Sequence, residues 1–146
     1  MFLNVESAKM VLSAYSVVCK PLCKEFGLSQ TAFDILMFLG NNPKYKTAGE
    51  IVEVRRIKAN LVSVNVDRLV NEGYLIRKPI EGDRRKTELV CTEKSQRIIT
   101  RGREVQKAFF EKMFENIDDE TRKAMNTASE IIRNNLKKIA EEEDKR

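Results

Sequence analysis

The stretch over residues 47–93 constrains the fold more than any other part of this chain. Two short helical patterns come first, two strand-like runs follow, and the beginning of another helix closes the stretch. The two runs, residues 74–80 and 86–92, are separated by a charged tip with the sequence Glu-Gly-Asp-Arg-Arg. A pair of helices followed by a basic hairpin is the plan of a winged helix-turn-helix, whose second helix enters the major groove of DNA.

Apolar residues at helical spacing predict two helices ahead of this stretch. The first covers residues 5–26; Pro21 falls within it, which predicts a kink or a break, and Gly27 ends it. Ser29 is the predicted N-cap of the second helix. That helix is apolar almost all round and therefore belongs in the core. The apolar start at residues 1–3 either packs on a second subunit or frays.

Two further helices lie within the central stretch. Thr47-Ala48-Gly49-Glu50 has the spacing of a capping box and begins a third helix, which ends near Val54. The fourth helix covers about residues 58–72, and Gly73 stops it. Its buried side is expected to hold Val62, Val66, Leu69 and Val70.

The opposite face of the fourth helix is expected to be exposed. At 100° per residue from Val62, this face carries Asn60, Val64 and Asp67, with Ser63 on its flank. Asn60 and Ser63 can hydrogen-bond base edges or phosphates, and Val64 can contact a thymine methyl group. The alternative for each is a surface residue that contacts nothing.

The hairpin tip carries cations that suit a minor groove. Arg84 and Arg85 can reach into that groove, whose negative potential attracts arginine. Asp83 is expected to hold one of the two guanidinium groups by a charge-assisted hydrogen bond. Pro79 lies near the tip, where its missing N–H does little harm. The alternative is a solvated hairpin tip without a ligand.

Two long helices complete the chain. Thr92 is the predicted cap of the fifth helix, which residues 116–120 interrupt. Asp118 is a suitable N-cap for the last helix, which runs to about Ala140. The apolar stripe of this helix consists of Met125, Ala128, Ile132, Leu136 and Ile139.

Positive charge is concentrated around the predicted wing. Residues 55–103 hold 13 Lys/Arg against 6 Asp/Glu, whereas residues 1–54 hold 5 of each and residues 104–146 hold 9 against 11. A phosphate-binding surface requires such a concentration of cations. A merely solvated basic face is the alternative.

The composition argues against several other classes of protein. The chain has no histidine, which excludes His-based triads and mixed Cys/His zinc sites, and its 3 scattered cysteines cannot form an all-cysteine tetrahedral site. No Gly-rich phosphate loop occurs, so neither an enzyme nor a cofactor is expected. Neither a membrane-spanning apolar run nor a secretory signal occurs, so no membrane partner is expected. The odd number of cysteines fits a reducing cytoplasm.

Together, the wing and the fourth helix resemble the MarR family of bacterial and archaeal transcription regulators. The family's wing signature, D-x-R-x-x-x-x-x-L-T, stands here as Asp83-Arg84-Arg85 through Cys91-Thr92, with Cys in place of Leu. Residues 57–69 and the sequence Glu72-Gly73-Tyr74-Leu75 also fit the family pattern. The departures are Lys58 where Ser or Asp often stands, Val64 where Arg is common, and Ser95 in place of Gly.

This resemblance implies a mainly α-helical fold with a small β-wing, in one domain over residues 1–146. The winged helix-turn-helix would cover about residues 29–92, with dimerisation helices at about residues 1–28 and 93–146. The resemblance also implies a homodimer on a pseudo-palindromic operator in double-stranded DNA, with Arg85 in the minor groove and Asp83 orienting it. The residues expected to lie at the DNA are Arg55, Arg56, Lys58, Asn60, Ser63, Val64, Asp83, Arg84, Arg85 and Lys86.

Many members of the family bind a small aromatic or phenolic effector between the dimer helices and the DNA-binding lobe. By this resemblance, Tyr15, Phe33 and Met37 are candidates to line such a cleft. Plain core positions are an equally good interpretation of these three residues.

The cysteines allow two interpretations. Cys19 and Cys23 lie one turn apart on the first helix, a geometry that disfavours a disulfide between them. Together with Cys91 they are either small buried apolar residues or, if exposed with a lowered pKa, thiol sensors.

A second function is also compatible with the sequence. A winged-helix module that docks on a protein partner would bind nucleic acid only weakly and without sequence preference. On that hypothesis, Arg84 and Arg85 tolerate charge reversal, whereas some face of the fourth helix does not.

Overall fold

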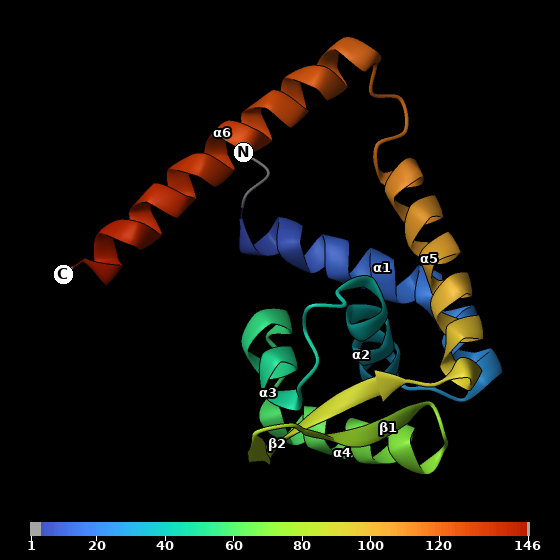
Figure 1. Cartoon of the computed structure of the whole chain (residues 1–146). Helices are drawn as coiled ribbons and strands as arrows, with labels where there is room; N and C mark the ends of the chain where they lie inside the picture. The colour runs from blue at the N-terminus through green and yellow to red at the C-terminus, as the bar shows by residue number, and fades with distance from the viewer. Residues whose placement is uncertain (1–3, 146) are drawn as a thin grey trace. The chain divides into compact units, whose positions relative to one another are not determined.

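The computed structural model describes residues 4–145, and the apolar start at residues 1–3 lies outside them. Its mainly α-helical fold with a two-stranded wing confirms the predicted fold class (Figure 1). Residues up to Phe109 form one compact unit, and residues from Phe110 onwards form another. The elements are α1 (Val5–Phe26), α2 (Gln30–Asn41), α3 (Ala48–Glu50), η1 (Ile51–Arg55), α4 (Ala59–Asn71), β1 (Leu75–Ile80), β2 (Asp83–Cys91), α5 (Glu93–Met113) and α6 (Asp119–Asp144).

Local signals set the ends of the first two helices as the sequence predicts. Gly27 ends α1 with a left-handed φ of 63°, and the Ser29 hydroxyl accepts a hydrogen bond from the Ala32 N–H at 3.0 Å to begin α2. The break predicted at Pro21 does not occur, because α1 continues through it as one helix. Pro21 and Val17 both lie on the exposed side of α1, where water can satisfy the Val17 carbonyl that loses its helical donor.

The capping box forms as predicted, but the helix that it begins changes character. The Thr47 hydroxyl accepts from the Glu50 N–H at 3.2 Å, and the Glu50 carboxylate accepts from the Thr47 N–H at 3.1 Å. After Glu50 the helix widens into the π-helical turn η1, which extends to Arg55. Arg56 then takes a left-handed φ of 61° and turns the chain toward α4.

The core of the first unit is built around α2. Seven of its residues are buried, which confirms the prediction that this helix is central. The buried faces of α4, α5 and the hairpin contribute to the same cluster. The residues with no exposed surface in this cluster include Phe33, Ile35, Leu36, Leu69, Leu75, Ile98 and Ile99.

Two glycines allow α2 and α5 to approach each other closely. A Cβ at Gly40 would lie 2.8 Å from Cγ2 of Ile99, and one at Gly102 would lie 2.4 Å from Sδ of Met37. Ile99 is fully buried and β-branched, so its side chain has little freedom to move away. The Gly40 contact is therefore the more rigid of the two.

We expect Gly40→Ala to lower the free energy of unfolding by about 1–3 kcal/mol, because overpacking at Ile99 outweighs the better helix propensity of alanine. Gly49→Ala is the matched control, since a Cβ there meets no atom closer than 3.9 Å. The control should be neutral or stabilising by up to about 1 kcal/mol. Urea unfolding of both variants tests this, and equal stability of the two would contradict the proposed close packing.

The hairpin is tighter than the sequence predicts. β1 and β2 pair antiparallel from Leu75↔Cys91 to Pro79↔Thr87, with an irregularity before Ile80↔Asp83. Only Glu81 and Gly82 remain at the tip, because Gly82 adopts a φ of 89° that permits a short turn. The returning strand thus begins at Asp83, three residues earlier than predicted, and Arg84 and Arg85 lie in β2 rather than at the tip.

Thr92 joins α5 to the end of α4 instead of capping α5 through its side chain. Its hydroxyl donates to the carbonyls of Gly73 at 2.6 Å and Tyr74 at 3.2 Å, so it is oriented away from the first N–H groups of α5. Ser95, which stands where relatives often have Gly, is fully buried, and its hydroxyl donates to the Thr92 carbonyl at 2.7 Å. Both hydroxyls therefore brace the junction between wing and helix.

The second unit consists of the end of α5, a connection and α6. Asp118 caps α6 as predicted, since its carboxylate accepts from the Thr121 N–H at 2.8 Å. The Arg122 guanidinium donates to the carbonyls of Phe114 and Ile117, in the connection that follows α5. No residue of α6 is buried. Its exposed apolar side chains are Met125, Ile131, Ile132, Leu136 and Ile139.

Candidate nucleic-acid interface

The outer face of α4 carries the side chains that the helical period predicts. Asn60, Ser63 and Val64 are all exposed, and Val64 retains 66% of its surface. The buried side holds Val62, Val66 and Leu69, as expected, whereas Val70 is only partly buried against the core. Lys58 precedes the helix without a side-chain capping bond, so the α4 N-terminus leaves N–H groups available to other acceptors. The α4 surface thus combines short polar groups with two exposed apolar side chains, Leu61 and Val64.

Asn65 is a buried residue of α4 that sequence reasoning missed. It is only 8% exposed; its side-chain oxygen accepts from the Ser29 hydroxyl at 2.9 Å, and its amide donates to the Leu61 carbonyl at 2.8 Å. The residue that caps α2 therefore also holds α4, and this bond sets the position of the exposed face against the core. The spacing of Asn65, three residues after Val62 and four before Leu69, places it on the buried side of the helical period and was the available sequence signal.

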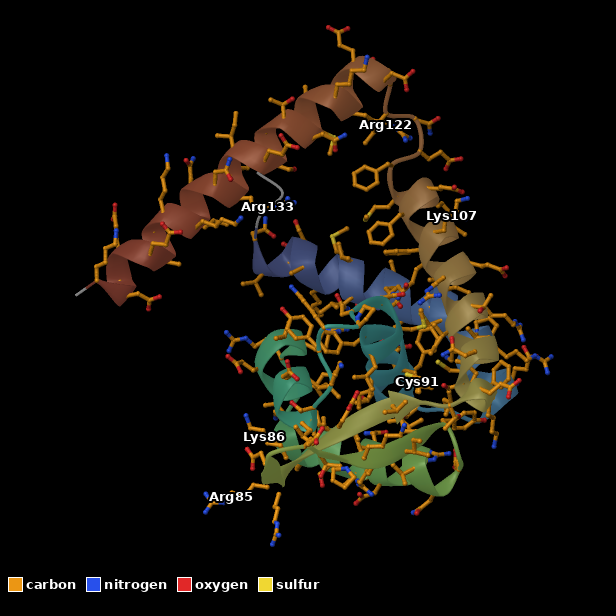
Figure 2. The ribbon with its side chains drawn as sticks, in the orientation of Figure 1. Arg85, Lys86, Cys91, Lys107, Arg122 and Arg133 are labelled. Atoms are coloured by element: carbon orange, nitrogen blue, oxygen red, sulfur yellow. The ribbon has the colours of Figure 1, made fainter. Side chains whose placement is uncertain are left out.

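Asp83 makes a different bond from the predicted one. Its carboxylate accepts from the backbone N–H of Arg85 at 2.9 Å and forms no bond to a guanidinium group. Asp83 thus fixes the main chain from which Arg85 projects, and the side chain of Arg85 stays available. Within residues 4–145, the guanidinium groups of Arg84 and Arg85 have no hydrogen-bond or ion-pair partner. Figure 2 shows Arg85 extending from the wing into solvent.

The two arginines of the turn before α4 differ in their surroundings. Arg55 is half-buried and lies 3.5 Å from the Asp34 carboxylate of α2. Burial raises the pKa of Asp34, and hydrogen bonding by Gln30 and the charge of Arg55 oppose that rise. Arg56 is exposed. Arg55 therefore ties η1 to α2, whereas Arg56 is accessible to a ligand.

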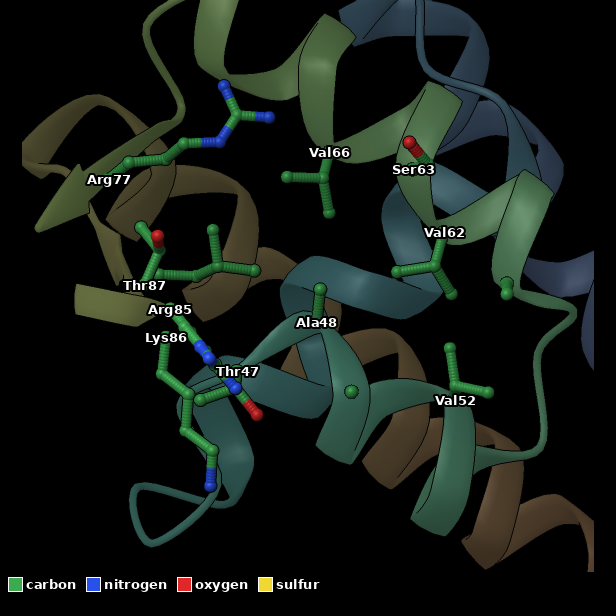
Figure 3. Close-up of a pocket in the computed structure, with 13 residues that line it drawn as sticks. Thr47, Ala48, Val52, Val62, Ser63, Val66, Arg77, Arg85, Lys86 and Thr87 are labelled. Carbon is green, nitrogen blue, oxygen red and sulfur yellow. The ribbon is translucent and has the colours of Figure 1, made fainter. Parts of the chain in front are cut away.

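An open cavity of about 510 Å³ separates α4 from the wing (Figure 3). Its floor is apolar, and three cations line it, Arg77 from β1 and Arg85 and Lys86 from β2. Glu50, at the end of α3, has a lowered pKa because the backbone N–H of Lys46 donates to it, with a smaller contribution from the charge of Lys86. No acidic residue lines the cavity itself. We call this cavity, with those three cations, the α4–wing groove.

The local sequence over residues 26–86 matches the family model described as the MarR family. Over this region the chain is similar to the MarR family. The transcriptional regulator PecS of Dickeya dadantii (strain 3937) is 34% identical over 79 residues. That match covers 53% of this chain and 48% of PecS, so the chain spans about half the length of this curated relative.

Solved structures of MarR-family regulators share the fold over nearly the whole chain. A MarR transcriptional regulator from Methanosarcina mazei Go1 has a TM-score of 0.74 at 21% identity, covering 92% of this chain and 96% of that one. A putative MarR family regulator from Listeria monocytogenes, solved in complex with a 26mer DNA, has a TM-score of 0.77 at 16% identity, covering 93% and 90%. At these identities the likeness establishes the winged-helix fold.

The three candidate effector residues lie at the meeting of α1, α2 and α5. Phe33 is fully buried and Met37 is 3% exposed, and both side chains lie within 3.1 Å of the point where a Cβ on Gly102 would be. Tyr15 is half-buried, its ring packs edge-on against Phe109 at 5.4 Å, and its hydroxyl accepts from the Gln106 amide at 2.9 Å. Their role toward an effector stays a prediction.

The three cysteines are all free thiols. Cys19 and Cys23 are buried in α1, and Cys91 is half-buried at the end of β2. Burial raises the pKa of all three thiols, and that of Cys23 to about 11. At neutral pH they are therefore protonated, which favours the interpretation as small packing residues over that of thiol sensors.

Residues 4–145 contain neither a metal-binding cluster nor a membrane-spanning helix. No group of three or more Cys, Asp or Glu side chains lies close enough together to hold a metal ion. No helix in that range combines the length and the apolar character needed to cross a bilayer.

Proposed function

We propose that this chain is a sequence-specific DNA-binding transcriptional regulator. One observation carries the proposal: Ser63, on the flank of the exposed face of α4, and the cations Arg85 and Lys86 of β2 line one open groove. In a winged helix-turn-helix, such a helix enters the major groove and the wing arginine reaches the adjacent minor groove. Asn60 and Ser63 would read base edges, Val64 a thymine methyl group, and Arg85 the minor groove.

The regulator is proposed to act as a homodimer on a pseudo-palindromic operator. Support comes from α6, which buries none of its residues and exposes a stripe of large apolar side chains. The outer side of α1 likewise exposes Val5, Met10 and Leu12. A second copy would remove these apolar surfaces from water. In this arrangement residues 29–92 read the DNA, and residues 1–28 and 93–146 hold the dimer together.

Relatives support the choice of partner. The Listeria monocytogenes regulator was solved with a 26mer DNA, and that protein shares the present fold. We extend double-stranded DNA as the partner to this chain and place its action in the cytoplasm, where the three free thiols stay reduced. The residues proposed to contact DNA are those named from the sequence, with Arg55 as the one already engaged by an acidic side chain.

A small aromatic or phenolic effector is proposed to modulate this binding. The proposed entry point of the effector is at Tyr15, because Tyr15 is the half-buried one of the three candidates. Its hydroxyl also accepts a hydrogen bond from the amide of Gln106 on α5. Phe33 and Met37 are packed behind it and would have to shift to admit a ligand. A ligand that separates Tyr15 from Gln106 would therefore disturb the packing of α1 on α5.

Selection of duplex DNA from a random pool by the purified protein tests the proposed function. We expect a palindromic consensus whose half-sites lie about 10–10.5 bp apart, centre to centre, or a multiple of that spacing. Enrichment of a single, non-repeated half-site would contradict the dimer. Failure to enrich any sequence would contradict direct reading of bases and would favour the winged-helix module that docks on a protein.

A further inference from the structure

The α4–wing groove lies where a winged helix must accommodate a DNA backbone. If α4 occupies the major groove and the wing the adjacent minor groove, the sugar–phosphate strand that separates those two grooves passes between them. This step rests on the proposed function. The groove is open, about 510 Å³ in volume, and carries cations without acidic residues in its lining. Its apolar floor suits the deoxyribose, and its cations suit the phosphates.

Arg77 is the cation of this groove that was not predicted to contact DNA. It lies outside both the wing signature and the exposed face of α4. It projects from β1 across the groove toward α4 (Figure 3). There its guanidinium forms an ion pair with the carboxylate of Asp67, on the exposed face of α4. The side chains of Arg77 and Asp67 are 43% and 60% exposed, respectively. The pair is thus accessible to a ligand that enters the groove.

We propose that Arg77 binds a backbone phosphate of double-stranded DNA, and that Asp67 occupies its guanidinium as a stand-in for that phosphate in the free protein. A carboxylate and a phosphate both accept paired hydrogen bonds from the guanidinium fork, so one can replace the other. An exposed ion pair contributes little free energy, so the exchange costs little. Release of counterions from the DNA favours the phosphate as the final partner.

The exchange gives Arg77 a role distinct from that of the base-reading residues. A phosphate contact carries no sequence information, so Arg77 should raise the affinity for every duplex alike. Asn60 and Ser63 would by contrast set the preference among sequences. Asp67 would lower affinity uniformly, because its carboxylate competes with the phosphate and repels it.

The first test is a salt titration of Arg77→Met with the selected operator and with a random duplex. We expect the slope of log K against log salt to fall in magnitude by roughly 1, and affinity at 0.15 M salt to fall roughly fivefold on both duplexes. Arg101→Met is the matched control, because Arg101 also forms an exposed ion pair, with Glu25 of α1, outside the groove. An unchanged slope in Arg77→Met, or an equal change in the control, would overturn the assignment.

The second test is Asp67→Asn, which keeps the size of the side chain and removes its charge. We expect this variant to bind both duplexes roughly two- to fivefold more tightly, with a smaller gain when Arg77→Met is also present. Glu25→Gln is the matched control and should leave binding unchanged. Weaker binding by Asp67→Asn would show that the ion pair positions Arg77 for DNA binding. A changed base preference would show that Asp67 reads a base. Either result would overturn the stand-in role.

The two proposals fail in distinguishable ways. If the unaltered chain binds no duplex, the proposed function fails and the role of Arg77 fails with it. If the unaltered chain selects an operator but Arg77→Met keeps its salt slope, only the phosphate assignment fails. Thermal unfolding of each variant accompanies the titrations, and the solvent-exposed position of the pair predicts unchanged folding.

Discussion

Arg85→Ala should weaken binding to the selected operator by about 1–3 kcal/mol, the largest loss expected from any single side chain of the wing. Asp83 fixes the backbone of Arg85 through a 2.9 Å hydrogen bond, and the guanidinium has no partner among residues 4–145. The side chain therefore has no internal bond to break before it binds DNA. Inserted into a minor groove, it would gain from the groove's negative potential.

Fluorescence anisotropy with a labelled operator measures this loss. Arg101→Ala is the matched control, since it removes the same charge from an exposed site on α5 and should change affinity far less. Asp83→Ala should lie between the two, because it frees the backbone but keeps the guanidinium. Equal affinities for Arg85→Ala and the unaltered chain would contradict the role of the wing.

Leu136→Asp should convert a dimer into monomers and remove operator binding. Leu136 is 60% exposed on α6, so within a single chain the substitution costs only the poorer helix propensity of aspartate, well under about 1 kcal/mol. At a dimer interface the same carboxylate would be buried without a partner, at a cost of roughly 3–5 kcal/mol. Because a palindromic operator requires two linked readers, loss of the dimer would also lose most of the affinity.

Sedimentation equilibrium tests the dimer directly. Asn134→Asp is the matched control, because it introduces the same charge two residues away, on the opposite side of the helix. The control should remain dimeric and bind the operator. A Leu136→Asp variant that keeps the dimer and its affinity would show that the apolar stripe of α6 has another partner.

Local signals explain how much of this fold the sequence could predict. Gly27, Ser29, Thr47 and Asp118 act on backbone groups within a few residues of themselves, so their hydrogen bonds follow from spacing alone. The two faces of α4 follow from the helical period in the same way. The capped ends of these elements lie where the sequence predicts, within a residue or two, whereas α6 continues to Asp144 and not to the predicted end at about Ala140.

Partners distant in sequence explain what could not be predicted. Asn65 is satisfied by Ser29, 36 residues away, and no local pattern identifies that bond. Asp83 was expected to bind a guanidinium, but the N–H of Arg85, two residues on, was already within its reach. Thr92 was expected to cap α5, but the Gly73 carbonyl lies 2.6 Å from its hydroxyl once the hairpin closes.

The candidate interface likewise has some features that follow from local sequence patterns and others that depend on residues distant in sequence. Exposure of Asn60, Ser63 and Val64 follows from the period of α4, and the positive charge of the wing follows from composition. The α4–wing groove and the pairing of Arg77 with Asp67 depend on how β1 packs beside α4. Such a contact is a product of tertiary packing, so it became visible only in the folded chain.

A salt titration of the selected operator against a scrambled duplex of equal composition tests the central claim most directly. A sequence-specific reader should bind the operator more tightly than the scrambled duplex by roughly a thousandfold or more. Log K for both should fall steeply and linearly with log salt, because several phosphates are neutralised. Equal affinity for the two duplexes, with weak binding confined to low salt, would contradict the account and identify the wing as a docking surface for protein.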